Sequence, residues 1–453
     1  MKPIQKISNK LKFYTALTTA KAAGTSLKLF KRAGTSLPGV LALKIQKDFI
    51  SNISKYCTNN IITITGTNGK TTTAGLLAHI LKTADNTVLH NEKGANMLSG
   101  IASALAINYK PFTKFNYAVL ESDEAYLTKL YDFINPQYLL VTNLFRDQLD
   151  RYGELDTTAK KIQEAVAKNP ELTLMVNADD PMLSEIGKNN KRIFFGFENI
   201  EYTTELTDSQ SPPEAVNCRC GHAMDYHKRF YAHIGHYYCP NCKKTRPMPA
   251  YNATAKIGAD SSEIKLKGMT FTTGLVGLYN AYNVLAAVST ALENGITPEF
   301  IQQALDTYQS MFGRAEKFVV KNKRVLVQLI KNPTGASEVL RTINKDSASN
   351  LLIIINDNYA DGRDVSWLWD TDFELLHDYP SQITVSGIRA DDMAARLKYA
   401  GFPTEKINII PQIKKALEYS IDQTEPYEKS QLVIMPTYTA LLEMQHLLQG
   451  KKK

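Results

Sequence analysis

The stretch "NNIITITGTNGKTTTAGLLAHILK", residues 59–82, decides the fold of this chain. Its β-branched residues at 61–64 predict a short buried strand. Gly66 and Gly69 then bracket a tight turn, and from Thr71 onward apolar residues recur at helical spacing. A strand, a glycine-containing loop, Lys-Thr and a helix in this order predict a phosphate-binding loop within an α/β fold.

The residue types of this loop suit phosphate chemistry. Loop amides and the positive end of the helix bind phosphate oxygens, Lys70 adds a mobile charge, and Thr71 would ligate magnesium. The general pattern places Gly six residues before the Lys, but Ile64 stands there, so this loop is the short form TGTNGKT. A chance glycine turn is the alternative, which the flanking strand and helix disfavour. The residues expected to contact nucleotide are Gly66, Thr67, Asn68, Gly69, Lys70, Thr71 and Thr72.

Composition limits the remaining possibilities. A length of 453 residues suggests about three domains, and 43% hydrophobic with 22% charged residues is ordinary for a globular protein. No run of 18 apolar residues occurs, and residues 1–50 are Lys-rich without the continuous apolar core of a signal peptide, so we expect no signal peptide. Five cysteines, four of them clustered, favour a reducing compartment and a metal site over disulfides. We therefore expect a cytoplasmic protein.

The net charge of +8 is concentrated near the N-terminus. Lys and Arg recur from Lys2 to Lys47, and no acidic residue occurs before Asp48. A basic amphipathic segment favours contact with an anionic surface, either phospholipid or a phosphate-bearing substrate. The alternative is a solvated helical arm that packs on the next domain.

TGTNGKT resembles the loop of Mur ligases and their folylpolyglutamate synthase relatives, ATP-dependent enzymes that activate a carboxylate as an acyl phosphate. Further segments resemble the same family in the same order, and as a set they are specific. They are "YAVLESDEA" (117–125), "LLVTNLFRDQLDRYGEL" (139–155), "MVNADDP" (175–181), "GLYNAYNVLAA" (277–287) and "GRAE" (313–316).

The resemblance implies roles for individual residues. Lys70 and Thr71 would hold the ATP phosphates and magnesium, with Glu121 as a second metal ligand. The matching positions for the adenine-contacting asparagines are Asn143 and Asn283, and for the arginine near the phosphates Arg314. Helix capping is the alternative for Asn280 and Asn283. Two departures are that Gln148 stands where many members have His, and that no lysine matches their carbamylated one.

A cysteine cluster occupies "NCRCGHAMDYHKRFYAHIGHYYCPNC", residues 217–242. Two close pairs, Cys218 with Cys220 and Cys239 with Cys242, predict an inserted zinc ribbon over about residues 215–249. Four thiolates would close the coordination sphere, which favours a structural metal over a catalytic one. The tight C-x-C spacing leaves His222 as an alternative to Cys218, and free cysteines as another alternative. The other histidines, His227, His233 and His236, are expected to be surface or packing residues.

An inserted ribbon before "GLYNAYNVLAA" resembles the MurT family, the synthetase subunits of lipid II isoglutaminyl synthase. Segments 34–45 ("GTSLPGVLALKI") and 329–340 ("LIKNPTGASEVL") resemble that family as well. The resemblance implies amidation of the D-glutamate α-carboxylate in the lipid II stem peptide to D-isoglutamine. It also implies a GatD-like glutaminase partner that supplies ammonia, with Lys70 and Glu121 acting at the ATP site and ATP, Mg²⁺ and a structural Zn²⁺ as cofactors.

Alternating strands and helical segments over residues 314–453 predict a second parallel α/β domain. One of its strands is followed by "NDNYADGRDVSWLWD" (356–370), at a strand end where such sheets place functional loops. The MurT resemblance implies that an aspartate here completes the partner's Cys-His pair. Our choice is Asp364, with Asp361 and Asp357 as alternatives, and turn capping is the competing role. The nearby Trp367 and Trp369 would be interface anchors or core residues.

The expected organisation is a basic arm (1–48), a Mur ligase-like ATP-binding domain carrying the ribbon (49–313) and a partner-binding α/β domain (314–453). Two other functions compete with amidation. A stand-alone amino-acid ligase would work without a glutaminase. A nucleic-acid-binding ATPase would use the net positive charge, but the basic residues gather at the N-terminus, so no nucleic-acid partner is expected. Lipid II would hold the chain at the inner face of the membrane.

Overall fold

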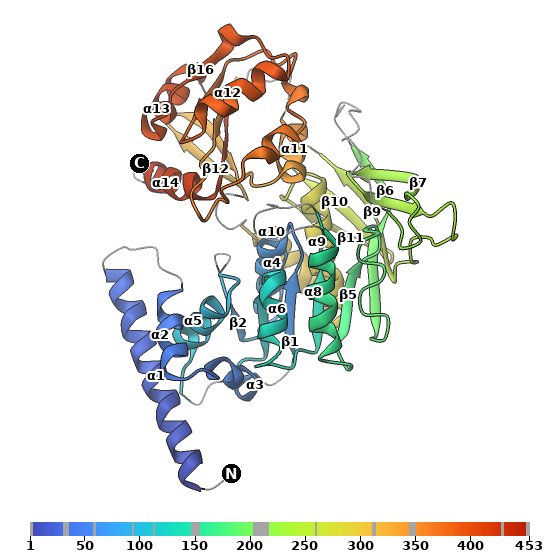
Figure 1. The fold of residues 1–453 in the computed structure, drawn as a ribbon, viewed down its shortest axis with the longest axis vertical. Coiled ribbons are helices and arrows are strands. Elements are labelled where there is room, and N and C mark those ends of the chain that lie inside the picture. Colours follow the sequence, from blue (N-terminus) through green and yellow to red (C-terminus); the bar gives the residue numbers. More distant parts are fainter. Residues whose placement is uncertain are drawn as a thin grey trace. The chain divides into compact units, whose positions relative to one another are not determined.

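Figure 1 shows the computed structural model of the chain. The structure describes residues 3–29, 36–57, 60–92, 95–111, 114–145, 155–202, 217–258, 261–309, 314–343, 350–426 and 430–449. The chain forms two compact units. Unit 1 comprises residues 1–144, 156–201 and 215–309, and unit 2 comprises residues 145–155, 202–214 and 310–453. The three-part division expected from the sequence stays a prediction.

Unit 1 is built on a nine-stranded sheet in the order β11-β10-β9-β6-β5-β4-β1-β3-β2. Pairing is parallel from β2 through β6, and β9, β10 and β11 form an antiparallel meander. The strands are β1 (Ile61–Thr65), β2 (Val88–His90), β3 (Tyr117–Glu121), β4 (Tyr138–Val141), β5 (Thr173–Asn177), β6 (Arg192–Tyr202), β9 (Tyr251–Ile257), β10 (Ser262–Leu266) and β11 (Met269–Thr273). The predicted strand at 61–64 is confirmed as β1, which is buried at every position.

Helices cover both faces of this sheet (Figure 1), as expected for strands that are buried throughout. Helix α4 packs against α9 and α10, while α6 and α8 lie together, joined by a hydrogen bond from Thr128 Oγ1 to the Lys161 carbonyl. The helices are α4 (Lys70–Thr83), α5 (Leu98–Asn108), α6 (Glu124–Leu130), α8 (Leu155–Ala167), α9 (Leu278–Glu293) and α10 (Pro298–Thr307). Helix α4 begins one residue before the predicted Thr71.

The basic N-terminal segment is helical and packs on the rest of unit 1. Its elements are α1 (Pro3–Leu29), α2 (Leu37–Ile45), the 3₁₀ turn η1 (Phe49–Asn52) and α3 (Ile53–Tyr56). The Phe13 ring stacks on Phe49 and Tyr56, with centroids 5.2 and 5.7 Å apart, and meets Tyr109 edge-on. Gly39 lies where α2 crosses α5, and its N–H donates to Ser103 Oγ at 2.7 Å. One side of α1 is therefore a packing face, and Lys10 and Lys12 lie on its exposed side.

The predicted ribbon contains a two-stranded antiparallel hairpin, β7 (Asp225–Tyr231) with β8 (Ile234–Tyr238). It lies in the chain between β6 and β9, which are neighbours in the large sheet. The insertion therefore leaves the order of the sheet intact.

Unit 2 is a six-stranded sheet in the order β12-β13-β17-β14-β15-β16, parallel except for the β12–β13 hairpin. Its strands are β12 (Arg314–Val320), β13 (Lys323–Gln328), β14 (Asn350–Ile354), β15 (Ile383–Ser386), β16 (Ile407–Ile409) and β17 (Gln431–Pro436). Its helices are α11 (Pro333–Thr342), α12 (Ala390–Tyr399), α13 (Ile413–Gln423) and α14 (Tyr438–Gln449), with 3₁₀ turns η2 (Ser366–Trp369), η3 (Phe373–Leu376) and η4 (Thr404–Lys406).

Strand β14 shows why unit 2 has two helical layers. Leu351 and Ile353 join one apolar cluster, with α11 and α12, whereas Leu352 and Ile354 join another, with α13 and α14. Side chains alternate between the two faces of a strand, so a continuous apolar run needs cover on both faces. The predicted second parallel α/β domain is thus confirmed. Within the described residues, no helix combines the length and the apolar character that crossing a bilayer requires.

Candidate functional site

The glycine loop connects the end of β1 to the start of α4 and is held by the end of β4. Asn143 carries both contacts: its carbonyl accepts from Thr67 N–H and its Oδ1 from Asn68 N–H, each at 2.9 Å. Gly66 has φ +128°, and a Cβ there would collide with the Thr142 hydroxyl. This position therefore requires glycine on two counts, conformation and space.

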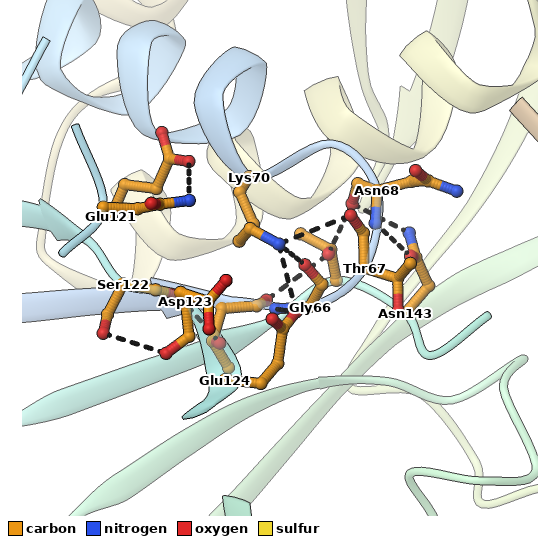
Figure 2. A network of polar contacts seen from close by, with 12 residues as sticks. Gly66, Thr67, Asn68, Lys70, Glu121, Ser122, Asp123, Glu124 and Asn143 are labelled. Carbon is orange, nitrogen blue, oxygen red and sulfur yellow. Dashed lines mark hydrogen bonds and ion pairs between the residues drawn. The ribbon is translucent and has the colours of Figure 1, made fainter. Parts of the chain in front are cut away.

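Lys70 forms an ion pair with Glu124, the first residue of α6, beside the loop (Figure 2). Its Nζ lies 3.1 Å from Glu124 Oε1 and also donates to the Gly66 carbonyl. The same Glu124 oxygen accepts from Gly66 N–H at 3.1 Å. Burial raises the pKa of the Glu124 carboxyl, and the Lys70 ammonium opposes that rise. The loop is therefore organised around a buried ion pair, and Lys70 must leave Glu124 to reach a phosphate.

Glu124 was not among the predicted site residues. It is the first residue of α6, three positions after Glu121 in the segment "YAVLESDEA". The signal available was an acid in the first turn of a helix that follows a strand end. That signal usually means only a favourable interaction with the helix dipole, so spacing alone did not single it out.

Glu121 closes β3, next to β1 in the sheet, and its side chain fits a cation ligand. Asn91 fixes its backbone through two hydrogen bonds of 2.8 Å, and Asn96 Nδ2 lies 3.4 Å from Oε1. Among the described residues none donates a hydrogen bond to Oε2, although the residue is only 2% exposed. A buried carboxylate oxygen without a partner is costly, and a bound cation would satisfy it. Figure 2 shows Glu121 and Glu124 on opposite sides of the Lys70 side chain.

The predicted adenine contact Asn283 lies on α9, against the loop. Its Oδ1 is 3.3 Å from Thr73 Oγ1, and a Cβ at Gly69 would collide with its amide. Gly69 has φ +85°, which glycine adopts without strain. The N-cap of α9 is Gly277, with no side-chain cap, and Asn280 Nδ2 instead donates to the Val276 carbonyl at 2.9 Å, so neither asparagine acts as a helix cap. Asn143 and Asn283 thus hold the loop from two sides.

Two predicted features lie outside the described part of the chain. Gln148 falls in the undescribed range 146–154, and the side chain of Arg314, at the start of β12, is likewise outside it. Their roles stay predictions.

The four predicted zinc ligands come together. The sulfurs of Cys218, Cys220, Cys239 and Cys242 all lie within 4.8 Å of one another, with two pairs at 3.5 Å. His222 lies beside the cluster, its Nδ1 3.7 Å from Cys220 Sγ, and its backbone N–H lowers the pKa of that thiol to about 5. Four converging thiols fit a tetrahedral zinc site, and whether Cys218 or His222 is the fourth ligand stays a prediction.

Charged groups anchor the cysteine knuckles to unit 1. Glu185, after β5, lies 3.3 Å from Arg219, which stands between Cys218 and Cys220, and 2.7 Å from Lys244, which follows Cys242 by two residues. Burial pushes the pKa of Glu185 upward, but hydrogen bonds from Lys188 and Lys244 outweigh it and lower the pKa to about 2. These contacts fasten the ribbon at its metal end.

The three candidate aspartates of unit 2 differ in their contacts. Asp361 accepts hydrogen bonds from Thr439 N–H at 2.7 Å and from the Thr439 hydroxyl, and burial raises its pKa. Asp357 is buried and pairs with Arg389 at 2.8 Å. Asp364 is partly exposed, and its Oδ1 accepts from Ser366 N–H at 2.8 Å. Asp361 and Asp357 are thus held inside unit 2, which leaves Asp364 as the best candidate to meet a partner.

The core alternative is confirmed for Trp367, and the interface role of Trp369 stays a prediction. Trp367 is 8% exposed and belongs to the core, whereas Trp369 is 54% exposed. The Trp369 ring meets Tyr399 edge-on at 5.5 Å, and Tyr399 is itself 76% exposed. Exposed aromatic pairs of this kind are enriched at protein interfaces.

Comparison with known proteins finds a matching family model in each of the two units. Residues 64–229 match the family model for the Mur ligase middle domain, and residues 329–441 match the model for the MurT ligase C-terminal region. The chain is 36% identical over 424 residues to the MurT subunit of a glutamine-hydrolyzing lipid II isoglutaminyl synthase from Streptococcus pneumoniae, a match that covers 92% of this chain and 93% of that protein. The chain belongs to the MurT family.

Other relatives support the assignment to the MurT family. A MurT subunit from Staphylococcus aureus is 32% identical over 434 residues, covering 95% of this chain and 96% of that protein. The fold resembles a pseudomurein peptide ligase type C from Methanothermus fervidus (TM-score 0.68, 20% identity, 89% of this chain and 81% of that one). It also resembles the MurF ligase from Thermotoga maritima in complex with ADP (TM-score 0.62, 13% identity, 90% and 84%). As a MurT protein, the chain has the Mur ligase-like α/β fold of an ATP-dependent synthetase.

Proposed function

We propose that this chain amidates the D-glutamate α-carboxylate of the lipid II stem peptide, using ATP and ammonia from a GatD-like glutaminase subunit. The observation that carries the proposal is similarity to a MurT subunit across 92% of the chain. That span includes both the nucleotide loop of unit 1 and the aspartate loop of unit 2. The name of that relative supplies the substrate and the use of glutamine, and the geometry supplies residues able to do this chemistry.

Amidation requires activation because a carboxylate is a poor electrophile. In the first step a carboxylate oxygen attacks the γ-phosphorus, ADP leaves, and an acyl phosphate forms. In the second step ammonia attacks the carbonyl carbon, the C–O bond to phosphate breaks, and phosphate leaves as the nitrogen loses a proton. The protein contributes mainly by positioning the reactants and neutralising negative charge.

The loop residues would share the work at the phosphates. Lys70 would exchange Glu124 for the β- and γ-phosphates, and the start of α4 would present its amides to the same oxygens. Thr71 and Glu121 would hold Mg²⁺, which supplies charge neutralisation when bound. Asn143 and Asn283 would fix the loop and contact the adenine side, and Arg314 would approach the phosphates.

Ammonia would come from the partner's hydrolysis of glutamine. Asp364 would complete the Cys-His pair of that glutaminase across the interface by orienting the imidazole and stabilising its protonated form. Its partial exposure supports this role over Asp361 and Asp357, whose carboxylates are buried and held by Thr439 and Arg389. Trp369 and Tyr399 would contribute apolar surface to the interface.

The remaining features fit the same scheme. A zinc site of four cysteines would stabilise a ribbon too small for a core of its own. The exposed lysines of α1 would favour the anionic membrane surface at which lipid II is presented, so the protein would work in the cytoplasm at the inner membrane face.

Mass spectrometry of lipid II tests the proposal. Lipid II is incubated with the chain, Mg-ATP and ammonium, and in parallel with a GatD-type partner plus glutamine. The expected product shows the small mass decrease of carboxylate to carboxamide, and glutamine serves as nitrogen source only with the partner. An unchanged mass with both nitrogen sources would reject the proposal, and gain of a whole amino-acid residue would indicate a stand-alone ligase.

A further inference from the structure

Two consecutive aspartates, Asp179 and Asp180, follow β5, and both are 0% exposed. Sequence reasoning treated "MVNADDP" only as a strand end, and the proposed chemistry gives these carboxylates no role. Burying two adjacent carboxylates costs several kcal/mol unless each is fully partnered. Their partners therefore indicate what they do.

Asp180 lies between the ribbon and the β4 side of the nucleotide loop. Its Oδ2 accepts from Leu144 N–H at 2.8 Å, and its Oδ1 accepts from Met182 N–H at 2.9 Å. His233, which separates β7 from β8 in the ribbon hairpin, is 0% exposed and places Nε2 3.4 Å from the same Oδ1. That distance is too long for an ordinary N–H···O bond, so the contact is mainly electrostatic and steric.

The contact with Leu144 matters because the preceding residue is Asn143. Asn143 holds the loop through its carbonyl and its side-chain oxygen, which accept from Thr67 and Asn68. A displacement of Asp180 would shift the backbone at Leu144 and with it both acceptors of Asn143. Three contacts in series thus connect the hairpin to the loop.

Asp179 makes a second connection, from the ribbon to the α9 side of the nucleotide loop. From the ribbon, Arg246 Nε approaches Oδ1 at 2.5 Å and Gly235 N–H donates to the Asp179 carbonyl at 2.9 Å. From α9, the Tyr282 hydroxyl donates to Oδ2 at 2.7 Å. The residue after Tyr282 is Asn283, whose amide packs against Gly69 and Thr73.

We propose that Asp179 and Asp180 are positioning residues that link the docked zinc ribbon to the two asparagines of the nucleotide loop, so that an ordered ribbon is required for tight nucleotide binding. The ribbon then serves the ATP site directly, beyond stabilising its own fold. The inference rests on the proposed nucleotide site, and it holds whatever acid is activated there.

Binding of MgADP to the full chain, measured by calorimetry alongside zinc content and melting temperature, tests this link. His233→Ala should weaken MgADP binding several-fold while zinc stays bound, because removing a fully buried imidazole beside Asp180 lets that carboxylate and the backbone at Leu144 shift. The matched control is His227→Ala on the same hairpin, since His227 is exposed and stacks only on Tyr238. It should bind MgADP like the wild type.

The second connection has its own variant. Tyr282→Phe removes one hydroxyl and should weaken MgADP binding several-fold with zinc retained. Tyr251→Phe is its control, because the Tyr251 hydroxyl donates to Glu293 at the other end of α9, at 2.9 Å. If His233→Ala unfolds or loses zinc, Tyr282→Phe decides the question alone.

Zinc removal distinguishes a link from a general loss of stability. Stripping zinc from the wild type should weaken MgADP binding, and stripping it from Asp180→Asn should cost less affinity than in the wild type, because one of the two connections is already broken. Additive losses of MgADP affinity, or wild-type affinity in both His233→Ala and Tyr282→Phe, would overturn this inference but not the proposed nucleotide site. A wild-type chain that fails to bind MgADP would overturn the nucleotide site as well.

Discussion

Lys70 Nζ lies 3.1 Å from Glu124 Oε1, and both side chains are at least nine-tenths buried. The lysine that we propose binds phosphate therefore already has a counter-ion. In the proposed site, nucleotide binding would break this pair and leave the Glu124 carboxyl buried beside incoming negative charge.

This exchange predicts proton uptake. Burial already raises the pKa of Glu124 above its usual 4.5, and departure of Lys70 would raise it further. A raised folded-state pKa means that the contribution of Glu124 to stability is full below about pH 4.5 and declines as the pH rises through that folded pKa. Calorimetry of MgADP binding near neutral pH, in buffers of different ionisation enthalpy, should show proton uptake in the wild type. Glu124→Gln should abolish it, and equal uptake in both proteins would contradict the exchange.

Glu121→Gln tests the metal ligand. A neutral amide cannot replace the carboxylate toward Mg²⁺, so amidation should fall about 100-fold or more while folding is preserved. The change is measured as initial rate against magnesium concentration. Glu92→Gln is the control, since Glu92 is exposed and its ion pair with Lys82 is long, at 3.8 Å. A normal magnesium dependence in Glu121→Gln would exclude Glu121 as a ligand.

Removing zinc should unfold the ribbon selectively. Structural zinc contributes about 10–16 kcal/mol of binding free energy in small zinc domains, which the ribbon cannot replace from its own core. Hydrogen exchange after chelation, or in Cys239→Ser, should show lost protection over residues 217–246 while β1 and β3 stay protected. Cys57→Ser should retain zinc, because Cys57 lies outside the cluster.

Substitutions of Asp364 and of Asp361 in unit 2 should have different effects. Asp364→Asn should lower glutamine-dependent amidation about 10³-fold or more and leave the ammonium-dependent rate within about twofold. Asp361→Asn should mainly lower the melting temperature, because its carboxylate accepts from Thr439 and Asn358. If a folded Asp364→Asn protein lost activity with both glutamine and ammonium, Asp364 would have a different role.

The exposed lysines of α1 should assist turnover at membranes only. Lys10→Gln with Lys12→Gln should weaken binding to anionic vesicles about 30-fold at low salt, because each lysine near such a surface contributes about 1 kcal/mol. Turnover of lipid II in those vesicles should fall with it, and turnover of a detergent-soluble analogue should not. Lys256→Gln with Lys265→Gln, also exposed but on β9 and β10, is the control. Deleting residues 1–40 is a weaker test, since it would remove Phe13 and expose the rings of Phe49 and Tyr56 on which Phe13 stacks.

Periodicity and spacing were enough to predict the elements but not their side-chain partners. The isoleucines of β1 and the alternating faces of β14 follow from local residue types, and four cysteines at two short spacings identify a metal site. Glu124 was missed because its importance comes from Lys70, on a different helix. Asp179 and Asp180 were missed for the same reason, since their partners lie on β4, α9 and the ribbon.

The choice among Asp357, Asp361 and Asp364 shows the same limit. One short loop contains all three, and sequence gives them similar chemistry. They are separated only by contacts with Arg389 and Thr439, which β15 and α14 bring back to the loop from far along the chain.

The position of the ribbon between β6 and β9 has a consequence for folding kinetics. β6 ends at Tyr202 and β9 begins at Tyr251, yet the two strands are sheet neighbours, so their pairing must close the whole intervening loop. Closing a loop costs chain entropy that grows with its length. Zinc binding by the unfolded chain would reduce the effective length of that loop before β9, β10 and β11 join the sheet. Completion of the large sheet would therefore be faster with zinc present during refolding than with zinc supplied afterwards.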